Sequence, residues 1–592
     1  MSRIDVDVAI VGGGLAGLSL ARQLLLQTDR TVLVLDRAAE LPPRRQKVGE
    51  ATVQVSGYYF SKVLELEEYL LREHYMKYNL RFLWKSAGTP ADAFEQFSQS
   101  YLRPLSNVAS YQLDRNKIEA ELLRRNREDP RCQVIHPASD VQVELAADDE
   151  PHRLRFRVDG EPREAAARWV VDASGRGRLL ATKLGLAERG EIRHGSSFLW
   201  VDGLLDIEKL TGRSAREIRL APERRALGHL PFFLATNHFM GEGWWVWVIP
   251  LQGKTSIGLV YDRALFDSTT VSTAEKLVAW ICRELPLFAR DLPQREVLDF
   301  WGYRDFGHTS AQTLSARRWA VVGEAGRFSD PLYSPGGDLI SIYNTLVRAA
   351  IELDDAAELE RRVPLYERAM RAIYDAYVPS YAVSYAVLAD PETYSLRYVW
   401  ELTIYFAFYV FPFVNDLHPE PRFLPAFLAL FAQLGPMNRR LHEYFAAFWA
   451  WRKEHLPPAP GPVFFDFMSL APLKRAEMLF YRVGIEPREA LGDLVRSLDD
   501  LRELAQFILV HLASRVAGDP SLVHRRAFVE AFDPRRAAFD PAEILALAAH
   551  AAGDPEVWSW SLDPQVLAAF AAKEPMAGGE EMATATVVEG RG

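Results

Sequence analysis

A glycine-rich segment near the N-terminus contains the first residues whose spacing suits ligand binding. Gly12, Gly14 and Gly17 form the pattern Gly-x-Gly-x-x-Gly. In a nucleotide-binding turn the first glycine permits the tight bend, the second lets the backbone approach a pyrophosphate, and the third lets helix and strand pack closely. Asp36 ends the next apolar segment, where an acid can accept hydrogen bonds from ribose hydroxyls. The spacing predicts a dinucleotide site.

The segments around these glycines have the pattern of a strand, a helix and a second strand. Residues 6–11 form an apolar run, residues 18–26 repeat apolar side chains at helical spacing, and residues 31–35 form a second apolar run. A helix that begins directly after the glycines offers unpaired N–H groups to phosphates. Because these elements and the acid occur together, a glycine-rich turn without a ligand is the weaker interpretation.

Two later segments also end a strand at small residues. They are WVVDASGRG at 169–177 and WAVVGEAGRFSDPLYSPGG at 319–337. With YQLDR at 111–115, they resemble the para-hydroxybenzoate hydroxylase class of FAD-dependent flavoproteins. The resemblance implies that Glu324, in place of the usual Asp, contacts the ribityl chain of FAD and that Arg115 helps to hold the flavin. The remaining cofactor-binding candidates in these segments are Asp172, Gly323, Asp330 and Pro331.

A tryptophan motif narrows the resemblance. Trp245 and Trp247 belong to Trp-x-Trp-x-Ile-Pro, a signature of flavin-dependent halogenases, and KVGEAT at 47–52 resembles their Gly-Glu segment. The similarity covers residues 5–345. It implies that the two tryptophans separate the substrate from the flavin, and it adds Lys47, Gly49 and Glu50 to the cofactor-binding candidates. Core packing explains the tryptophans equally well, because they alternate with valines as in a strand buried on both faces.

The halogenase resemblance also implies a reaction. Reduced FAD and O₂ form a hydroperoxide, a halide (chloride or bromide) converts it to hypohalous acid, and a lysine directs this acid onto an electron-rich aromatic or polyketide-type substrate. Lys77, just before an apolar strand, occupies the place of that lysine. A solvated lysine at a strand entrance is the alternative, and Lys47 and Lys62 are weaker candidates.

The segment Ser334 to Asp338 departs from the family's halide site. Pro335 has no N–H to donate, and Asp338 adds a carboxylate that repels an anion unless it points away. Gly336 and Gly337 still offer two N–H groups and are candidate cofactor-site residues. The Gly-Glu segment also lacks the proline that usually follows it.

Three other functions stay open at this point. The first is an FAD-dependent monooxygenase that hydroxylates without halide, and the second is a dehydrogenase or reductase of an apolar substrate. The third is a flavin-binding partner without turnover. The chain has no second glycine fingerprint for NAD(P)H, so we expect a separate flavin reductase to supply reduced FAD. The expected substrate is a small molecule or is bound to a carrier.

These motifs need an α/β fold of the Rossmann type followed by further domains. We expect an FAD-binding domain over 1–190 with 300–350, and an antiparallel-sheet substrate domain over 191–300, where apolar and polar residues alternate. A helical C-terminal region is expected over 351–576 and a disordered tail over 577–592. The predicted helices of the later part are 339–353, 363–388 with a kink at Pro379, 423–434, 437–453, 487–510, 521–532, 541–552 and 564–572.

Composition excludes several other classes of protein. The 592 residues carry 69 basic and 79 acidic side chains, a net charge of −10, which argues against nucleic acid binding. Two cysteines exclude a disulfide framework and a cysteine-rich metal site. The N-terminus does not resemble a signal peptide, so a cytoplasmic location is expected. The apolar segment 403–414 is too short for a membrane span and predicts a buried helix or a pocket wall.

Tyrosines recur at helical spacing in the C-terminal region, at 374, 377, 381 and 385. A packed helix face is the simpler interpretation. The alternative is the wall or lid of an apolar pocket for a large flat or lipid-like substrate.

Overall fold

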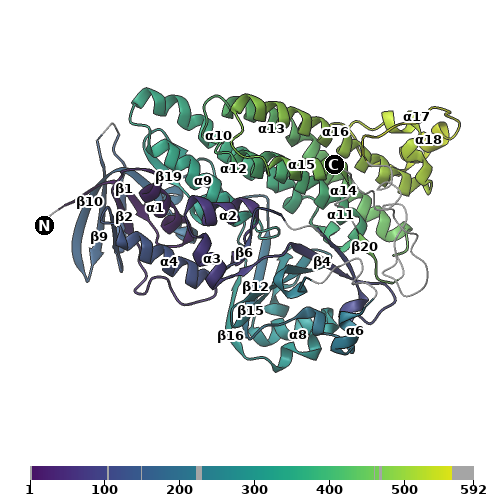
Figure 1. Ribbon diagram of the computed structural model, residues 1–592, viewed down its shortest axis with the longest axis horizontal. Helices are drawn as coiled ribbons and strands as arrows, with labels where there is room; N and C mark the ends of the chain where they lie inside the picture. Colours follow the sequence, from purple (N-terminus) through teal and green to yellow (C-terminus); the bar gives the residue numbers. More distant parts are fainter. Residues whose placement is uncertain are drawn as a thin grey trace, which may run out of the picture.

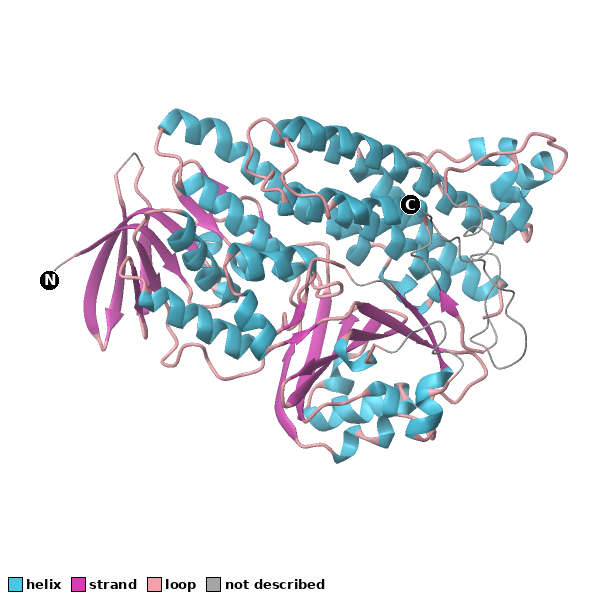
Figure 2. Ribbon diagram, viewed as in Figure 1, coloured by secondary structure: helices cyan, strands magenta, loops and turns pink. Residues whose placement is uncertain are grey.

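The computed structural model describes residues 3–102, 106–147, 150–221, 230–458, 461–465 and 470–562. Two sheets lie next to each other, and long helices from the C-terminal part of the chain run along both of them (Figure 1). Figure 2 shows the same division, with strands in two groups and a thick helical layer beside them. The α/β fold with a helical C-terminal region is therefore confirmed.

The first sheet is the Rossmann-type sheet that the glycine motif predicted. Five parallel strands follow the order β19-β10-β1-β2-β7, and β8, β9 and β18 extend it as antiparallel strands. Helix α1 packs against α4 and α9. The bounds are β1 (Ile4–Val11), β2 (Val32–Leu35), β7 (Cys132–Ile135), β8 (Ser139–Glu144), β9 (His152–Val158), β10 (Glu161–Asp172), β18 (Leu314–Ser315), β19 (Trp319–Val321), α1 (Leu15–Gln27), α4 (Arg115–Glu128) and α9 (Pro335–Ile351).

The second sheet follows the order β16-β12-β15-β14-β13-β4-β5-β20 and is mostly antiparallel. It draws β4 and β5 from before residue 190 and β20 from the C-terminal region, so it extends beyond the predicted span 191–300. The bounds are β4 (Leu80–Lys85), β5 (Phe97–Tyr101), β12 (His194–Asp202), β13 (Thr236–Gly241), β14 (Trp244–Leu251), β15 (Lys254–Asp262), β16 (Val297–Tyr303), β20 (Phe464–Phe465), α6 (Ala215–Arg219) and α8 (Ala274–Glu284).

Short elements connect the two sheets. They include two small antiparallel strand pairs, β3 with β6 and β11 with β17. These connecting elements are α2 (Gln54–Tyr58), α3 (Glu67–Glu73), α5 (Leu179–Lys183), β3 (Tyr75–Met76), β6 (Tyr111–Gln112), β11 (Ala187–Glu188) and β17 (Thr309–Ser310). A π-helix continues α2 over Tyr59–Val63.

The C-terminal helices pack on the Rossmann-type part through one continuous apolar core, which joins side chains of α1 and α9 to those of α10, α11 and α16. Their bounds are α10 (Ala356–Ala382), α11 (Pro391–Ile404), a π-helix (Tyr405–Val410), α12 (Phe411–Val414), α13 (Leu424–Phe431), α14 (Leu434–His455), α15 (Ala471–Leu479), α16 (Pro487–Ala517), α17 (Arg526–Glu530) and α18 (Pro541–Ala551).

The structure corrects several helix predictions. Pro379 lies inside α10, which ends at Ala382, and a 3₁₀ turn follows over Tyr385–Ala389. The helix predicted over 521–532 is instead a 3₁₀ turn over Pro520–His524 followed by the short α17. The predictions for 564–572 and for the tail 577–592 lie outside the described residues.

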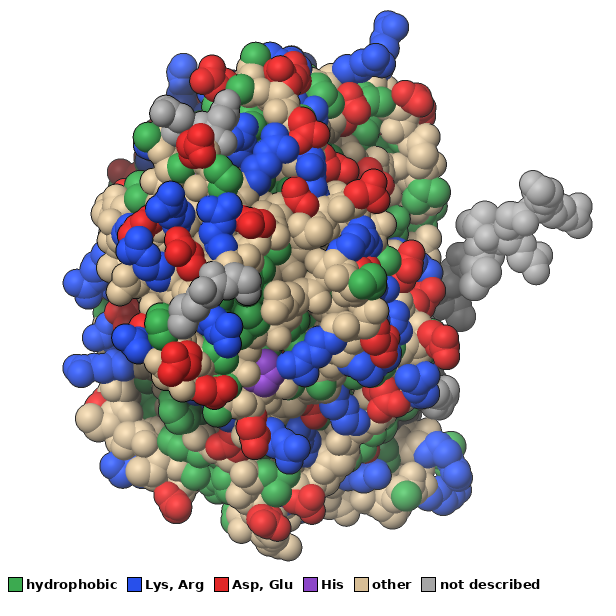
Figure 3. Space-filling view, turned by 90° about the vertical axis from the view of Figure 1, so that its left-hand side faces the viewer, with side chains coloured by type: hydrophobic (Ala, Val, Ile, Leu, Met, Phe, Trp, Pro, Cys, Tyr) green, Lys and Arg blue, Asp and Glu red, His purple; other side chains and the backbone are tan. Residues whose placement is uncertain are grey.

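The apolar segment 403–414 is buried, as predicted, in the run from α11 through the π-helix to α12. None of the helices in the described ranges is long and apolar enough to cross a membrane. The face drawn in Figure 3 mixes acidic and basic side chains without a large region of one sign.

Candidate functional site

The glycine turn has the geometry that a phosphate-binding turn requires. A Cβ on Gly12, whose φ is +122°, would lie 2.1 Å from the Ala173 carbonyl oxygen, and a Cβ on Gly17 would lie 2.0 Å from the Gly12 oxygen. Gly14 instead faces open space, since a Cβ added there would meet no heavy atom within 4 Å. Gly14 precedes α1 as its N-cap, without a side-chain hydrogen bond. The turn therefore combines close backbone packing with free helix N–H groups for a pyrophosphate.

Two predicted cofactor residues bind the protein's own backbone. Asp36 accepts from the N–H of Gly13 with Oδ2 at 2.6 Å and from that of Ala38 with Oδ1 at 2.7 Å. Asp172 is buried and accepts from Ser174 and Leu180 through its two oxygens. Burial raises the pKa of Asp172. Both carboxylates thus hold the turns that border the nucleotide site.

A cavity of about 90 Å³ opens beside the glycine turn, and we call it the tryptophan cavity. It brings together residues from four predicted motifs. The predicted site residues that line it are Gly49, Glu50, Arg115, Trp245, Trp247, Gly323, Glu324, Pro331, Gly336 and Gly337. Lys47, Asp172 and Asp330 are not among the lining residues.

Glu50 is the acceptor that holds the tryptophan signature in place. Its Oε1 accepts from the indole N–H of Trp200 at 2.6 Å, and its Oε2 accepts from the Ser256 hydroxyl at 2.5 Å. Ser256 in turn accepts from the Trp247 indole at 3.0 Å. Full burial raises the pKa of Glu50 to about 7. The Gly-Glu segment and the Trp-x-Trp segment therefore form one hydrogen-bonded unit.

Trp245 is anchored to the helical region. Its indole N–H donates to the Tyr385 hydroxyl at 2.7 Å, and that hydroxyl donates to Asp330 at 3.2 Å. Asp330 also contacts Nδ1 of His194 at 2.6 Å. Asp330 thus binds Tyr385 and His194 without lining the cavity, whereas its neighbour Pro331 lines it.

Arg115 lies at the cavity, but Lys47 points away from it. Arg115 donates to the Val48 carbonyl at 2.5 Å and pairs with Glu119 at 2.6 Å. Lys47 pairs with the other oxygen of Glu119 at 2.5 Å. Burial raises the pKa of Glu324, and the charge of Arg115 partly offsets this effect. Lys47 therefore supports Arg115 through Glu119 in this structure.

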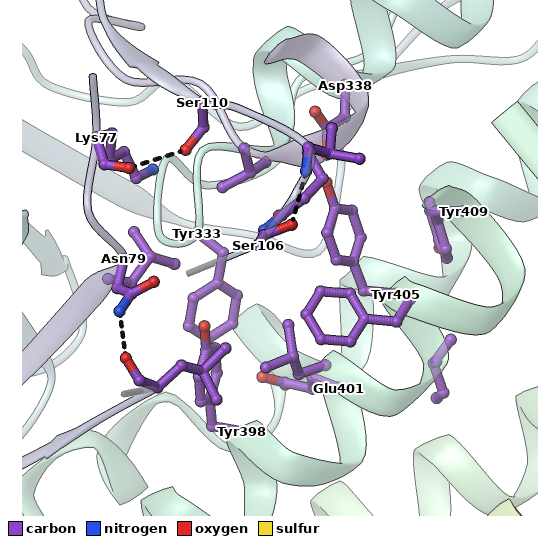
Figure 4. Close-up of a pocket in the computed structure, with 18 of the residues that line it drawn as sticks. Lys77, Asn79, Ser106, Ser110, Tyr333, Asp338, Tyr398, Glu401, Tyr405 and Tyr409 are labelled. Atoms are coloured by element: carbon purple, nitrogen blue, oxygen red, sulfur yellow. Dashed lines mark hydrogen bonds between the residues drawn. The ribbon is translucent and has the colours of Figure 1, made fainter. Parts of the chain in front are cut away.

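A second cavity, of about 160 Å³, contains Lys77, and we call it the lysine cavity (Figure 4). Tyrosines from the segment before α9, from α10 and α11, and from the π-helix form much of its wall. They are Tyr333, Tyr377, Tyr398, Tyr405 and Tyr409. Of the four tyrosines predicted at helical spacing, Tyr374 and Tyr381 are buried in α10, as a packed helix face requires, and Tyr377 lines this cavity. Tyr385 lies in the 3₁₀ turn after α10 and accepts from Trp245.

Lys77 is buried where the two cavities adjoin. Its Nζ donates to the Thr52 carbonyl at 2.5 Å, and Thr52 lines the tryptophan cavity while the next residue, Val53, lines the lysine cavity. Likewise, Gly337 lines the tryptophan cavity and the next residue, Asp338, lines the lysine cavity. Burial lowers the pKa of Lys77 to about 7, and the charge of Asp338 opposes this shift. Lys77 is therefore not the solvated lysine of the alternative interpretation.

Asp338 does not line the same cavity as Gly336 and Gly337, whose N–H groups were the expected halide donors. Its side chain lines the lysine cavity, where Oδ1 accepts from the N–H of Ser56 at 2.9 Å. The carboxylate points away from the tryptophan cavity because the first turn of α9 directs it to the other side. Burial raises the pKa of Asp338 to about 6, and hydrogen bonding from Ser56 and Tyr405 limits this rise. Gly336 and Gly337, in the same turn of α9, remain on the tryptophan side.

Several residues of the site were not predicted as such. Glu401 lines the lysine cavity from α11, Thr52 receives the Lys77 ammonium, and Ser256 links Glu50 to Trp247. Thr52 is the last residue of the Gly-Glu segment, which could have indicated it. Glu401 lies in a helix that the sequence analysis did not predict, so no signal marked it.

Comparisons with known proteins agree with this geometry. Residues 5–254 match the family model of an FAD binding domain. The flavin-dependent halogenase chlA of Dictyostelium discoideum is 26% identical over 459 residues, which cover 70% of this chain and 72% of that protein. A Pseudomonas fluorescens chlorinase of 1H-pyrrole-2-carbonyl-peptidyl-carrier protein is 23% identical over 356 residues, or 57% of this chain and 73% of that protein.

A solved structure shows the same fold. The crystal structure of halogenase PltM in complex with phloroglucinol and FAD has a TM-score of 0.58 and 19% identity, and the match covers 84% of this chain and 98% of that chain. The open face of Gly14 and the lining of the tryptophan cavity fit FAD. The chain is an FAD-dependent oxidoreductase that is similar to the flavin-dependent halogenases.

Proposed function

We propose that this protein halogenates an electron-rich aromatic substrate, with FAD at the tryptophan cavity and the substrate in the lysine cavity. The observation that carries the proposal is the place of Lys77, buried at the wall between the two cavities and bonded to Thr52. Bound reduced FAD supplies hypohalous acid from O₂ and a halide. Lys77 then receives the acid and presents it to the substrate.

The electrostatics of Lys77 suit this role. With a pKa near 7, the amine and the ammonium forms coexist at neutral pH. The ammonium can donate a hydrogen bond to hypohalous acid, and the amine can react with it. The wall formed by Thr52, Val53, Gly337 and Asp338 separates the substrate from the flavin, which disfavours direct hydroxylation.

The N–H groups of Gly336 and Gly337 are the proposed halide donors. They belong to the first turn of α9, where N–H groups lack intrahelical partners and the helix dipole favours an anion. Pro335 at the first helical position cannot donate, but two donors remain. The Asp338 carboxylate faces the other cavity, so it does not oppose an anion at this place.

Two partners complete the proposal. A separate flavin reductase supplies reduced FAD, as the missing second nucleotide motif suggests. The aromatic substrate is either free or bound to a carrier, because related halogenases include one that acts on a pyrrole held by a peptidyl-carrier protein.

The test supplies chemically reduced FAD, air and bromide to the protein, with phloroglucinol and indole as two different aromatic probes. Brominated product, detected by mass spectrometry, is expected with the native protein. Lys77→Ala should abolish this product while flavin reoxidation continues. Lys62→Ala is the matched control, since Lys62 is exposed and pairs with Glu67.

The outcomes separate the alternatives. Hydroxylated product without bromide would establish a monooxygenase instead. Anaerobic oxidation or reduction of a substrate would establish a dehydrogenase or reductase. Bromination that survives Lys77→Ala would refute the role of Lys77.

A further inference from the structure

His238 is a buried histidine of the tryptophan cavity that the proposed function does not use. It lies in β13, in register with Trp247 of β14 on one side and with Phe82 of β4 on the other. Its ring stacks on Phe82 at 5.1 Å between centroids and lies 5.3 Å from the ring of Trp245. Only 2% of the residue is exposed, and it lines the cavity. Packing therefore fixes this imidazole in the same wall as the two tryptophans.

One nitrogen of the ring is held by the backbone. Nδ1 lies 3.1 Å from the Arg81 carbonyl oxygen, and a carbonyl oxygen can only accept, so Nδ1 carries the hydrogen. Burial lowers the pKa of His238 to about 3; the backbone of Arg81 and Thr236 opposes this shift, and the charge of Lys77 adds to it. Because the imidazole is neutral at pH 7, its second nitrogen, Nε2, has a lone pair and no hydrogen.

Nε2 is an acceptor without a partner. It makes no hydrogen bond to any of the described residues, and it keeps some accessible surface, unlike the unpaired nitrogens of the fully enclosed His418. The other polar side chains that the second sheet contributes to this cavity already have partners. They are Thr236, Trp245 and Trp247, which bond to Gln112, Tyr385 and Ser256 respectively. A hydrogen-bond acceptor thus remains free on this wall.

The chemistry of this acceptor selects its ligand. A neutral Nε2 cannot donate, so it offers nothing to a halide ion or to another anion. It suits a small uncharged molecule with an O–H group, and the cavity beside it measures only about 90 Å³. Hypohalous acid is such a molecule, because it has two heavy atoms, is largely uncharged at neutral pH and carries its hydrogen on oxygen.

His238 also lies next to the segment that carries Lys77. Lys77 precedes β4, the parallel neighbour of β13. The N–H of Tyr78 donates to the Leu234 carbonyl at 3.0 Å, and the N–H of Thr236 donates to the Asn79 carbonyl at 3.2 Å. The residues after Lys77 therefore run alongside the start of β13. His238 lines the tryptophan cavity and Lys77 the lysine cavity, so the two side chains lie on opposite sides of one wall.

We propose that Nε2 of His238 accepts a hydrogen bond from the O–H of hypohalous acid while the acid passes from the flavin to Lys77. The bond holds the oxygen end of the acid and leaves the halogen end free to face the lysine. No covalent bond to His238 forms, and the histidine is unchanged afterwards. The inference rests on the proposed function, because that function supplies the acid.

Two substitutions separate this role from a purely structural one. The amide of His238→Asn takes the place of Nδ1, so it keeps the bond to Arg81 but removes the acceptor at Nε2. The amide oxygen of His238→Gln instead reaches the place of Nε2, so it keeps an acceptor there and gives up the bond to Arg81. A structural role predicts greater harm from Gln, whereas acid binding predicts greater harm from Asn.

The experiment supplies reduced FAD, air and bromide to the protein, with phloroglucinol or indole as probe and a large excess of taurine in solution. Taurine converts hypobromous acid that escapes from the protein into a bromamine, which hydrogen peroxide alone does not form. His238→Asn should lower the brominated probe formed per flavin oxidised about tenfold and raise the bromamine accordingly. Its flavin reoxidation, FAD content and thermal unfolding should match those of the native protein.

Two further variants complete the series. His238→Gln should keep the ratio of brominated probe to bromamine within about threefold of the native ratio. His418→Asn is the matched control and should leave this ratio unchanged, since His418 is a fully buried histidine that lines neither cavity.

The outcomes distinguish this inference from the proposed function. If the native protein brominates a probe and His238→Asn shows the native ratio, the inference is overturned and the proposed function stands. Release of bromamine by His238→Gln but not by His238→Asn would overturn it in the same way. Should His238→Asn lose FAD, His238→Gln decides alone, because native coupling supports the inference and bromamine release overturns it. A native protein that forms neither brominated probe nor bromamine would refute the proposed function, and this inference with it.

Discussion

Replacing Lys77 with methionine should make the protein more stable and inactive at the same time. Methionine is unbranched, of similar length and apolar. Burial lowers the pKa of Lys77 from 10.5 to about 7. Since each tenfold change in an equilibrium constant corresponds to about 1.4 kcal/mol, holding an ammonium group there costs up to about 5 kcal/mol. The variant also loses the hydrogen bond to Thr52, which costs it about 1–3 kcal/mol. Lys77→Met should therefore stabilise the folded protein by about 2–4 kcal/mol in total.

The assay is thermal unfolding of the FAD-loaded protein at pH 7, where Lys77→Met should raise Tm by about 2–3 °C, because the unfolding entropy of a 592-residue chain is about 1.2 kcal/mol per degree. The pH dependence of this stability difference is a second check. A lysine whose folded pKa is lowered destabilises the protein fully below the folded pKa, near 7, and this penalty disappears as pH rises towards 10.5. The advantage of the variant should therefore shrink between about pH 7 and 10. A variant that unfolds earlier than the native protein at pH 7 would refute the reasoning.

Three other perturbations test the remaining parts of the site. Tyr385→Phe leaves the Trp245 indole N–H without its acceptor and should destabilise the protein by about 1–3 kcal/mol; a urea midpoint equal to that of the native protein would contradict this. Glu50→Gln should remove a pH dependence of protein stability. Because the pKa of Glu50 is raised to about 7 in the folded protein, the native protein loses stability as pH rises from 4.5 through 7. The unfolding midpoints of native and variant protein at pH 5 and pH 8 measure this difference. Gly14→Ala should leave the apoprotein as stable as before, since its Cβ meets open space, yet weaken FAD binding about tenfold or more in a fluorescence titration, whereas unchanged FAD affinity would place the pyrophosphate elsewhere.

The Rossmann-type part was predicted well from the sequence because its signals are local. The turn from β1 to α1 and the strand β2 lie within residues 4–35, and so does the close approach of Gly17 to Gly12, whereas the close approach of Gly12 to Ala173 involves a distant strand end. The Trp-x-Trp pair was open between core packing and function; core packing is confirmed, and the functional role stays a prediction. Trp245 and Trp247 are buried in β14 and also line the tryptophan cavity.

Most helices of the C-terminal region were predicted, but the helix that contributes Glu401 to the lysine cavity and the end of α10 were not. Helix α11 was missed, and Glu401 with it, because nearly all of this helix is buried, so that polar residues such as Ser395 and Arg397 occupy buried positions and the apolar periodicity is weak. Pro379 was predicted to kink a helix over 363–388, whereas the structure ends that helix at Ala382. Packing against the rest of the core decides such boundaries more than local propensity does.

Residues that lie close together in the chain were enough to specify the nucleotide turn, the FAD family and the lysine candidate. Three further features became visible only in the folded chain: Lys77 is buried between two cavities, Asp338 faces the lysine cavity, and Tyr385 accepts a hydrogen bond from Trp245, 140 residues away in the chain. The direction of a side chain and its pKa depend on contacts with segments far away in the chain. These contacts arise when the C-terminal helices close over the Rossmann-type part, and no local pattern encodes them.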